Sequence, residues 1–259
     1  MKFRFYLLAG SLLAGATARA QTTSPLPTMK ATLDTVAVTG TTRVLTLAAV
    51  PGPEVVTASL TPGRKFAVFH KPPTRSHEYD LTGIRVLVSK QYNRSNTGLL
   101  LLNLALPDSS THAPSAQLLL PAPIAVTDRE VRRAHDSVLT LDVRAYHITM
   151  PAKGLFVVAE GAPEPPYQFL GDTTFADHGF GKPRPFVHVR LGNPATPHKQ
   201  LFVNAMDFIN VRGIRTTGQP QTWDYVRRKN SWQQRLASYP NCPQCAISNA
   251  GLELVVREL

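Results

Sequence analysis

Two carboxylates and an imidazole lie close together in one glycine-flanked segment, residues 171–179, which is predicted to form a loop. Asp172, Asp177 and His178 carry oxygen and nitrogen donors of the kind that bind calcium or a transition metal, or that transfer a proton. An EF-hand loop needs more oxygen ligands at alternating positions than this segment has. A purely structural role is the alternative, because Asp side chains in loops often bond to nearby backbone. We therefore assign Asp172, Asp177 and His178 as candidate ligand-binding residues, and predict no metal site and no cofactor.

The two cysteines of the chain, Cys242 and Cys245, form a Cys-Pro-Gln-Cys sequence. Oxidoreductases use this spacing where a helix N-terminus follows a strand and stabilises a thiolate. Here a turn at residues 248–251 and a strand-like C-terminal segment follow instead. A tetrahedral zinc site would need two further ligands. The sequence thus favours a local disulfide, or an unreactive thiol pair, over redox catalysis.

Aromatic residues are frequent near the Asp172 segment and again toward the C-terminus. They are Tyr167, Phe169, Phe175, Phe180, Phe186, Trp223 and Trp232. An aromatic ring beside polar groups suits carbohydrate recognition, in which the ring stacks on a sugar face. In a β-sandwich, aromatic side chains more often fill the core. Both interpretations stay open from the sequence.

Established catalytic motifs are absent from the sequence. It contains no Gly-x-Ser-x-Gly elbow, no His-Glu-x-x-His and no phosphate-binding loop. This absence favours a protein without enzymatic activity. An exported hydrolase is the remaining alternative, because glycosidase carboxylates need only lie about 5–9 Å apart in space and can be distant in sequence.

The elements that must position these residues are short strands. In residues 138–144, Leu139, Leu141 and Val143 alternate with polar residues, which is the period-two pattern of a half-buried strand. The same alternation or a short apolar run predicts strands at residues 36–38, 44–47, 55–58, 66–69, 84–88, 100–106, 155–159, 187–191, 201–203, 222–226 and 252–256. Residues 229–231 are predicted to turn the chain back toward Trp232, and His135 and Asp136 to form a turn before Val138.

Helical periodicity is weak, and 22 prolines interrupt most segments. Many short strands separated by turn residues predict an all-β fold, an antiparallel two-sheet sandwich resembling a jelly roll. No internal repeat or boundary divides residues 33–259, so we expect a single domain there. Residues 21–32 are small, polar and proline-containing, and predict a flexible leader.

The N-terminus has the features of a secretory signal peptide. Lys2 and Arg4 precede an apolar run at residues 7–16, which is too short to span a bilayer. The following Ala-Arg-Ala predicts cleavage between Ala20 and Gln21, and no cysteine follows the run to direct lipidation. We therefore expect export to the periplasm or the medium, with no transmembrane segment in the mature chain.

The chain is basic, with a formal net charge of +11. Removal of residues 1–20 would leave about +8, a charge that favours contact with acidic surfaces. The basic residues are scattered, and no aromatic pattern accompanies them. The sequence therefore predicts no nucleic-acid partner.

The order of segments at residues 84–89, 100–104, 137–143 and 154–160 resembles a group of uncharacterised exported bacterial proteins. Some of those proteins carry a carboxypeptidase-like regulatory domain, which is missing here. The resemblance covers roughly residues 55–160, with a weaker likeness at residues 252–259. It implies an exported β-sandwich and no known activity.

Residues 32–41 resemble the segment that opens the plug of TonB-dependent outer-membrane receptors, which acts by adding a strand to a partner's sheet. The remaining length is too short for both plug and barrel, so a chance likeness to a first strand is favoured. We expect a non-enzymatic protein with a binding or supporting role at the cell envelope, whose partner is an envelope protein or a glycan. The alternative is a carbohydrate-binding or polysaccharide-acting module that uses residues 171–186.

Overall fold

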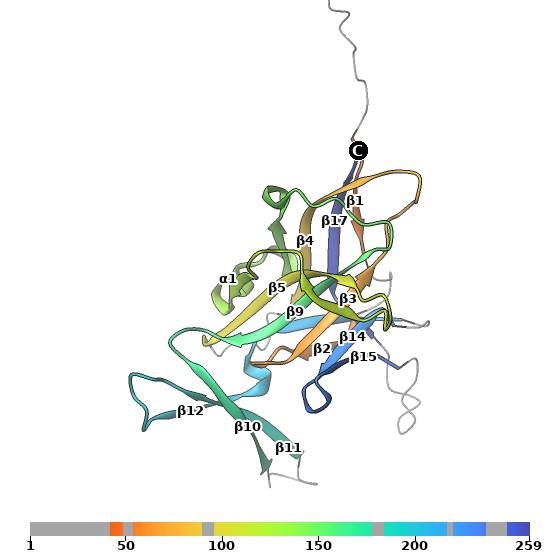
Figure 1. Cartoon of the computed structure of the whole chain (residues 1–259). Coiled ribbons are helices and arrows are strands. Elements are labelled where there is room, and N and C mark those ends of the chain that lie inside the picture. The colour runs from red at the N-terminus through yellow and green to blue at the C-terminus, as the bar shows by residue number, and fades with distance from the viewer. Residues whose placement is uncertain (1–41, 49–53, 90–95, 178–183, 217–219, 237–247) are drawn as a thin grey trace, which may run out of the picture. The chain divides into compact units, whose positions relative to one another are not determined.

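The computed structural model of the chain describes residues 42–48, 54–89, 96–177, 184–216, 220–236 and 248–259 (Figure 1). All of these belong to one compact unit, Thr41–Leu259. The signal peptide with its cleavage site at Ala20 and Gln21, the leader, residues 32–41, and Cys242 and Cys245 lie outside the described residues. The statements about them therefore stay predictions from the sequence.

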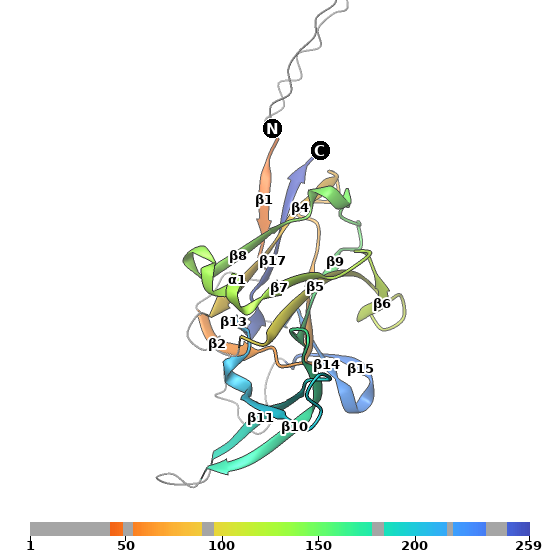
Figure 2. The same ribbon diagram turned by 90° about the vertical axis from the view of Figure 1, so that its left-hand side faces the viewer.

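The first large sheet is antiparallel throughout. Its main order is β1 (Val44–Leu47), β17 (Leu252–Glu258), β4 (Tyr79–Ser89), β13 (Asn210–Arg215) and β16 (Ser248–Ala250). In addition, β2 (Glu54–Ser59) pairs with β13, and β8 (Val138–Asp142) pairs with β4. The strands β1 and β17 run side by side in both views (Figure 1, Figure 2).

The second large sheet is also antiparallel. Its order is β15 (Ser231–Gln234), β14 (Thr222–Val226), β3 (Lys65–His70), β9 (Leu155–Pro163), β5 (Gly98–Pro107) and β6 (Pro114–Leu118), and β7 (Ile124–Thr127) pairs with β5. One short α-helix, α1 (Asp128–Arg133), follows β7. The 3-10 turns among the described residues are η1 (His135–Ser137), η2 (Arg144–Tyr146), η3 (Ala205–Asp207) and η4 (Arg227–Lys229).

A third, three-stranded sheet has the order β10 (Gln168–Asp177), β11 (Arg184–Gly192) and β12 (Gln200–Asn204). In Figures 1 and 2 it lies at the end of the unit opposite β1. It has a small core of its own, made by Val189, Leu191, Val203 and Phe208. The sequence did not predict this third sheet.

The inner faces of the two large sheets contribute side chains to one hydrophobic core through alternate positions. Leu100, Leu102 and Leu104 of β5 and Leu252 and Leu254 of β17 are all fully buried in it. Complete burial of a leucine stabilises a protein by about 1.5–3 kcal/mol. The predicted all-β, antiparallel sandwich is therefore confirmed, and the alternation seen in the sequence is its cause.

Polar bonds also link the two large sheets along one edge. The side-chain oxygen of Asn249 in β16 accepts a hydrogen bond from the Thr222 hydroxyl of β14 at 3.2 Å. The Arg235 guanidinium contacts both carboxylate oxygens of Asp224 at 2.8 and 3.0 Å and donates to the Ser248 carbonyl at 2.9 Å. The β14–β15 hairpin is thereby held to the first sheet.

Local predictions agree with the structure where alternation was clear. The segments at residues 44–47 and 222–226 form β1 and β14 with the expected bounds, and a turn does precede Trp232, but as η4 it begins two residues earlier than predicted. The turn expected at His135 and Asp136 is η1. The expectation that residues 171–177 form a loop is wrong, because they pair along β11 as part of β10.

A histidine lies among the buried hydrophobic side chains of the second sheet. His70, at the end of β3, follows the buried positions Phe66 and Val68, and only 3% of it is exposed. Burial lowers its pKa from the ordinary 6.5 to about 4, and a hydrogen bond with the Leu252 backbone opposes this only in part. The imidazole is thus neutral in the folded protein at pH 7.

We predict that acidification destabilises the fold through His70. Between pH 6.5 and pH 4 the unfolded chain binds a proton at this position that the folded chain does not bind. The free energy of unfolding therefore falls as pH decreases, by about 3 kcal/mol in total from this group. Urea unfolding at pH 7, 5.5 and 4.5 should show a smaller decrease in His70→Leu than in the unchanged chain. His198→Gln, which replaces an exposed imidazole, is the control; an identical pH dependence in all three proteins would contradict the prediction.

Candidate functional site

The outer face of the second sheet is unusually apolar. Opposite the inward positions of β3 and β9 lie Ala67, Phe69, Phe156 and Val158, which form a second hydrophobic cluster. Trp223 packs on this cluster, with its ring 6.2 Å from that of Phe156 and perpendicular to it. An antiparallel sheet with one solvated face normally carries polar residues there. This apolar face is therefore a candidate binding surface.

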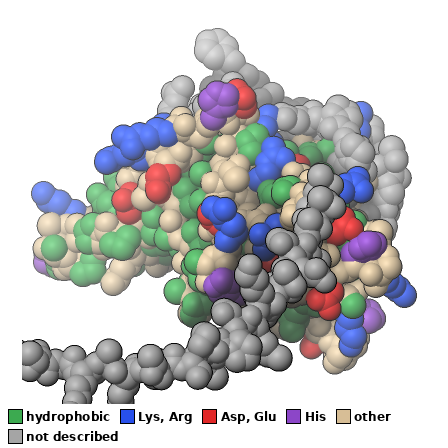
Figure 3. Space-filling view, turned by 90° about the horizontal axis from the view of Figure 1, so that it is seen from above, with side chains coloured by type: hydrophobic (Ala, Val, Ile, Leu, Met, Phe, Trp, Pro, Cys, Tyr) green, Lys and Arg blue, Asp and Glu red, His purple; other side chains and the backbone are tan. Residues whose placement is uncertain are grey.

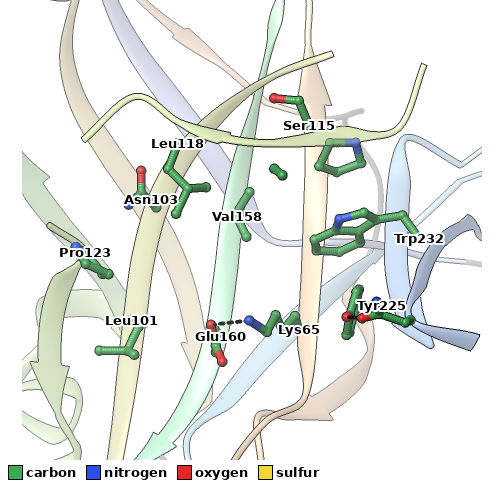
Figure 4. Close-up of a pocket in the computed structure, with 13 residues that line it drawn as sticks. Lys65, Leu101, Asn103, Ser115, Leu118, Pro123, Val158, Glu160, Tyr225 and Trp232 are labelled. Carbon is green, nitrogen blue, oxygen red and sulfur yellow. Dashed lines mark hydrogen bonds and ion pairs between the residues drawn. The ribbon is translucent and has the colours of Figure 1, made fainter. Parts of the chain in front are cut away.

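A groove of about 430 Å³ lies on this face, and we call it the aromatic groove (Figure 4). Its floor comes from β3, β9 and β5 and includes Lys65, Val158 and Glu160. The β14–β15 hairpin forms one wall, and the β6 strand with the residues around it forms the other. Four segments that are distant in sequence thus meet at one site.

Two aromatic side chains form the hairpin wall. Tyr225 and Trp232 are directly opposite each other in the β14–β15 pairing, with ring centroids 5.3 Å apart and an interplanar angle of 66°. The Tyr225 hydroxyl donates a hydrogen bond to the side chain of Asn230, whose left-handed backbone (φ 49°) ends the η4 turn. Both rings are half-buried, so they present partly exposed, pre-positioned surfaces to the groove.

An ion pair occupies the floor beside this wall. The Lys65 ammonium lies 2.8 Å from a carboxylate oxygen of Glu160, and the two residues are cross-strand partners in β3 and β9. The same ammonium lies 5.7 Å from the Tyr225 ring centroid. About a third of each charged side chain is exposed, so the pair adds little to stability. It places a hydrogen-bond donor and an acceptor side by side in the groove.

Asn103 also lines the groove, but its side chain forms hydrogen bonds with the backbone of the protein. Its side-chain oxygen accepts hydrogen bonds from the backbone N–H groups of Leu104 at 2.7 Å and Leu120 at 3.1 Å. Only 4% of Asn103 is exposed. It holds the segment after β6 against β5 and so fixes the position of the second wall.

The candidate residues Asp172, Asp177 and His178 are not among the residues that line the aromatic groove. Asp172 lies in β10, and its carboxylate is 3.8 Å from the Arg227 guanidinium. Asp177 is the last residue of β10, and His178 lies outside the described residues. Asp172 is thus paired with a cation of η4.

Arg227 connects the third sheet to the second one. Its guanidinium lies 4.8 Å from the Phe169 ring centroid of β10, and its Nε donates to the Gly63 carbonyl at 2.8 Å. A second nitrogen donates to the Pro62 carbonyl. Tyr167 and Phe169, both singled out in the sequence, pack against the core of the third sheet. For these two aromatic residues the core interpretation is confirmed.

Most of the groove was not predicted from the sequence. Trp232 was a candidate residue there, but Tyr225 and the Lys65–Glu160 pair were not. A usable signal was the alternation of Trp223 and Tyr225 before a turn that leads to Trp232, which places aromatic rings on one face of a hairpin. Lys65 and Glu160 give no local signal, because only the β3–β9 register brings them together.

The described residues were also compared with the requirements of a metal site and of a membrane-spanning helix. No three His, Cys, Asp or Glu side chains within these ranges are grouped so that they could hold a metal ion. None of the helices described has the length and apolar composition needed to cross a membrane. On the face seen in Figure 3, Lys and Arg side chains lie at several separate places among apolar ones.

We predict that Arg227 is required for stable attachment of the third sheet. Arg227→Ala removes the contact with Phe169 and the bonds to two carbonyls, which together contribute about 1 kcal/mol or more. Amide hydrogen exchange in β10 and β11 should become roughly fivefold faster, while exchange in β5 and β9 stays unchanged. Arg228→Ala, an exposed neighbour in η4, is the control. Unchanged exchange in Arg227→Ala would show that other contacts hold the third sheet.

Comparison of the chain with protein-family models, with curated proteins and with solved structures found no match in any of the three.

Proposed function

We propose that this protein is a non-enzymatic binding protein of the cell envelope and that it recognises a glycan in the aromatic groove. The observation that carries the proposal is the half-buried Tyr225–Trp232 pair beside the Lys65–Glu160 ion pair. The signal-peptide features of residues 1–20 support the location.

The groove combines the two kinds of contact that a sugar requires. The faces of Tyr225 and Trp232 suit the apolar C–H face of a pyranose ring. Lys65 donates and Glu160 accepts hydrogen bonds, which matches hydroxyl groups that do both. Since these groups are held by strand pairing and by each other, little side-chain entropy is lost when a ligand binds.

The single carboxylate among the described groove residues favours binding over hydrolysis. A glycosidase uses two carboxyl groups about 5–9.5 Å apart. Among the described residues that line the groove, Glu160 is the one carboxylate, and it is paired with Lys65. This arrangement supports recognition without cleavage.

We predict that Trp232→Ala weakens glycan binding about tenfold or more, because one wall of the stacking surface is lost. A glycan array with the chain from residue 21 onward identifies a bound oligosaccharide, and titration calorimetry then measures the dissociation constant of each variant. Phe202→Ala removes an exposed aromatic side chain from the third sheet and should leave the affinity unchanged.

Thermal unfolding of each variant distinguishes lost contacts from lost folding. Absence of binding to every glycan on the array would reject the proposed function. Equal affinities of Trp232→Ala and the unchanged chain would reject the groove as the site.

A further inference from the structure

A second cavity, of about 910 Å³, lies at the other end of the same sheet face. The strand residues that line it are Phe69 of β3, Phe156 of β9 and Trp223 of β14, with Pro107 and Gln234 at the ends of β5 and β15. The segments that follow β3 and β5 and those that precede β9 and β14 supply the rest of its lining. We call it the basic cavity for the side chains described below.

Strand register shows that the groove and the basic cavity share one continuous surface. Along β9, Glu160 lines the groove, Phe156 lines the cavity, and Val158 lies between them on the same face. Four residues of strand correspond to roughly 13 Å at about 3.3 Å per residue. Trp232 of the groove and Trp223 of the cavity pack on the same apolar cluster. One extended molecule can therefore contact both.

Three cationic side chains line the basic cavity. Lys71 and Arg75 follow β3, Lys153 precedes β9, and all three are exposed. In the part of the chain that the structure describes, none of the three has an ion-pair partner. Their charge is available to a ligand.

The carboxylate in the cavity is hydrogen-bonded within a turn. Asp108 is the one carboxylate among the described lining residues. Its Oδ1 accepts hydrogen bonds from the backbone N–H and the hydroxyl of both Ser110 and Thr111, at 2.7–3.0 Å. These bonds hold the pKa of Asp108 well below its usual range. Among the described lining residues, three cations therefore face one carboxylate, and that carboxylate already accepts hydrogen bonds from Ser110 and Thr111.

The charge pattern differs between the two ends of the face. Among the described residues, the aromatic groove has one cation, Lys65, which Glu160 neutralises, whereas the basic cavity has three cations without an ion-pair partner. A ligand that fits both ends is uncharged at the groove and negatively charged at the cavity. A single-stranded nucleic acid, with a phosphate on every unit, would bring negative charge next to Glu160.

We propose that the basic cavity is an anion subsite, and that the ligand is an acidic polysaccharide in which neutral and carboxylate-bearing or sulfated sugars alternate. Neutral rings contact Tyr225 and Trp232, and the anionic group is bound by Lys71, Arg75 and Lys153. This inference rests on the proposed glycan-binding function and adds the chemical class of the glycan.

The test compares two matched probes. One is an octasaccharide of alternating uronic acid and N-acetylhexosamine, and the other is the same octasaccharide with its carboxyl groups reduced to alcohols. We expect the acidic form to bind at least about tenfold more tightly at 50 mM salt, and this difference to shrink at 500 mM because the charges are screened.

Variants assign the difference to the cavity. The triple variant Lys71→Ala, Arg75→Ala, Lys153→Ala should bind both probes equally, with the affinity of the unchanged chain for the reduced probe. The control triple variant Lys199→Ala, Arg215→Ala, Arg228→Ala removes the same net charge from exposed positions outside the cavity and should keep the difference.

Each other outcome has a defined meaning. Equal binding of the two probes, with loss of both in Trp232→Ala, would overturn the anion subsite and leave the proposed function standing. Binding of neither probe would overturn this inference, whereas the glycan array decides the proposed function. Equal losses in the two triple variants would show that bulk charge and not the cavity attracts the ligand. Tighter binding of a single-stranded oligonucleotide that depends on Lys71, Arg75 and Lys153 would overturn the polysaccharide assignment.

Discussion

Burial of alternate side chains between the two large sheets is the constraint on which the rest of the structure depends. Successive residues of a strand point to opposite faces, so once Leu100, Leu102 and Leu104 are inside, Leu101 and Asn103 must face outward. A shift of one residue would exchange the two sets and expose the leucines. The cost of that exposure holds the strands in register, and the register in turn holds every outward side chain in place.

That register leads to an outer face of the second sheet that is apolar in its middle and differs in charge at its ends. Ala67, Val158 and Trp223 belong to the apolar middle. The Lys65–Glu160 pair lies toward one end, and the cations of the basic cavity, Lys71, Arg75 and Lys153, lie at the other. Lys65, Glu160 and Trp223 stand on strands whose inner faces are buried, so the backbone that carries them is held by the core beneath.

Elements with strong local patterns were predictable, and elements that depend on their neighbours were not. The hairpin of β14 and β15 shows its alternation and turn in a short stretch of sequence. Strand β13 contains Arg212 and Gly213 and gives no clear alternation, yet β2, β4 and β16 pair with it. The short helix α1 was not predicted, although the Thr-Asp-Arg-Glu sequence of its Thr127–Glu130 capping box is a local signal for a helix start. Strand β10 was read as a loop, because its polar residues form a strand only beside β11.

The sequence by itself determined the all-β class and the faces of the best-patterned strands, because alternation with a period of two is a local property. It also pointed to Trp232 as a residue of interest. Only the tertiary structure decided which strands lie next to each other, and therefore that Lys65 meets Glu160 and that Asp172 meets Arg227. Strand pairing joins segments that are far apart in the chain, so the residues of a site on a sheet surface become neighbours only when the register is set.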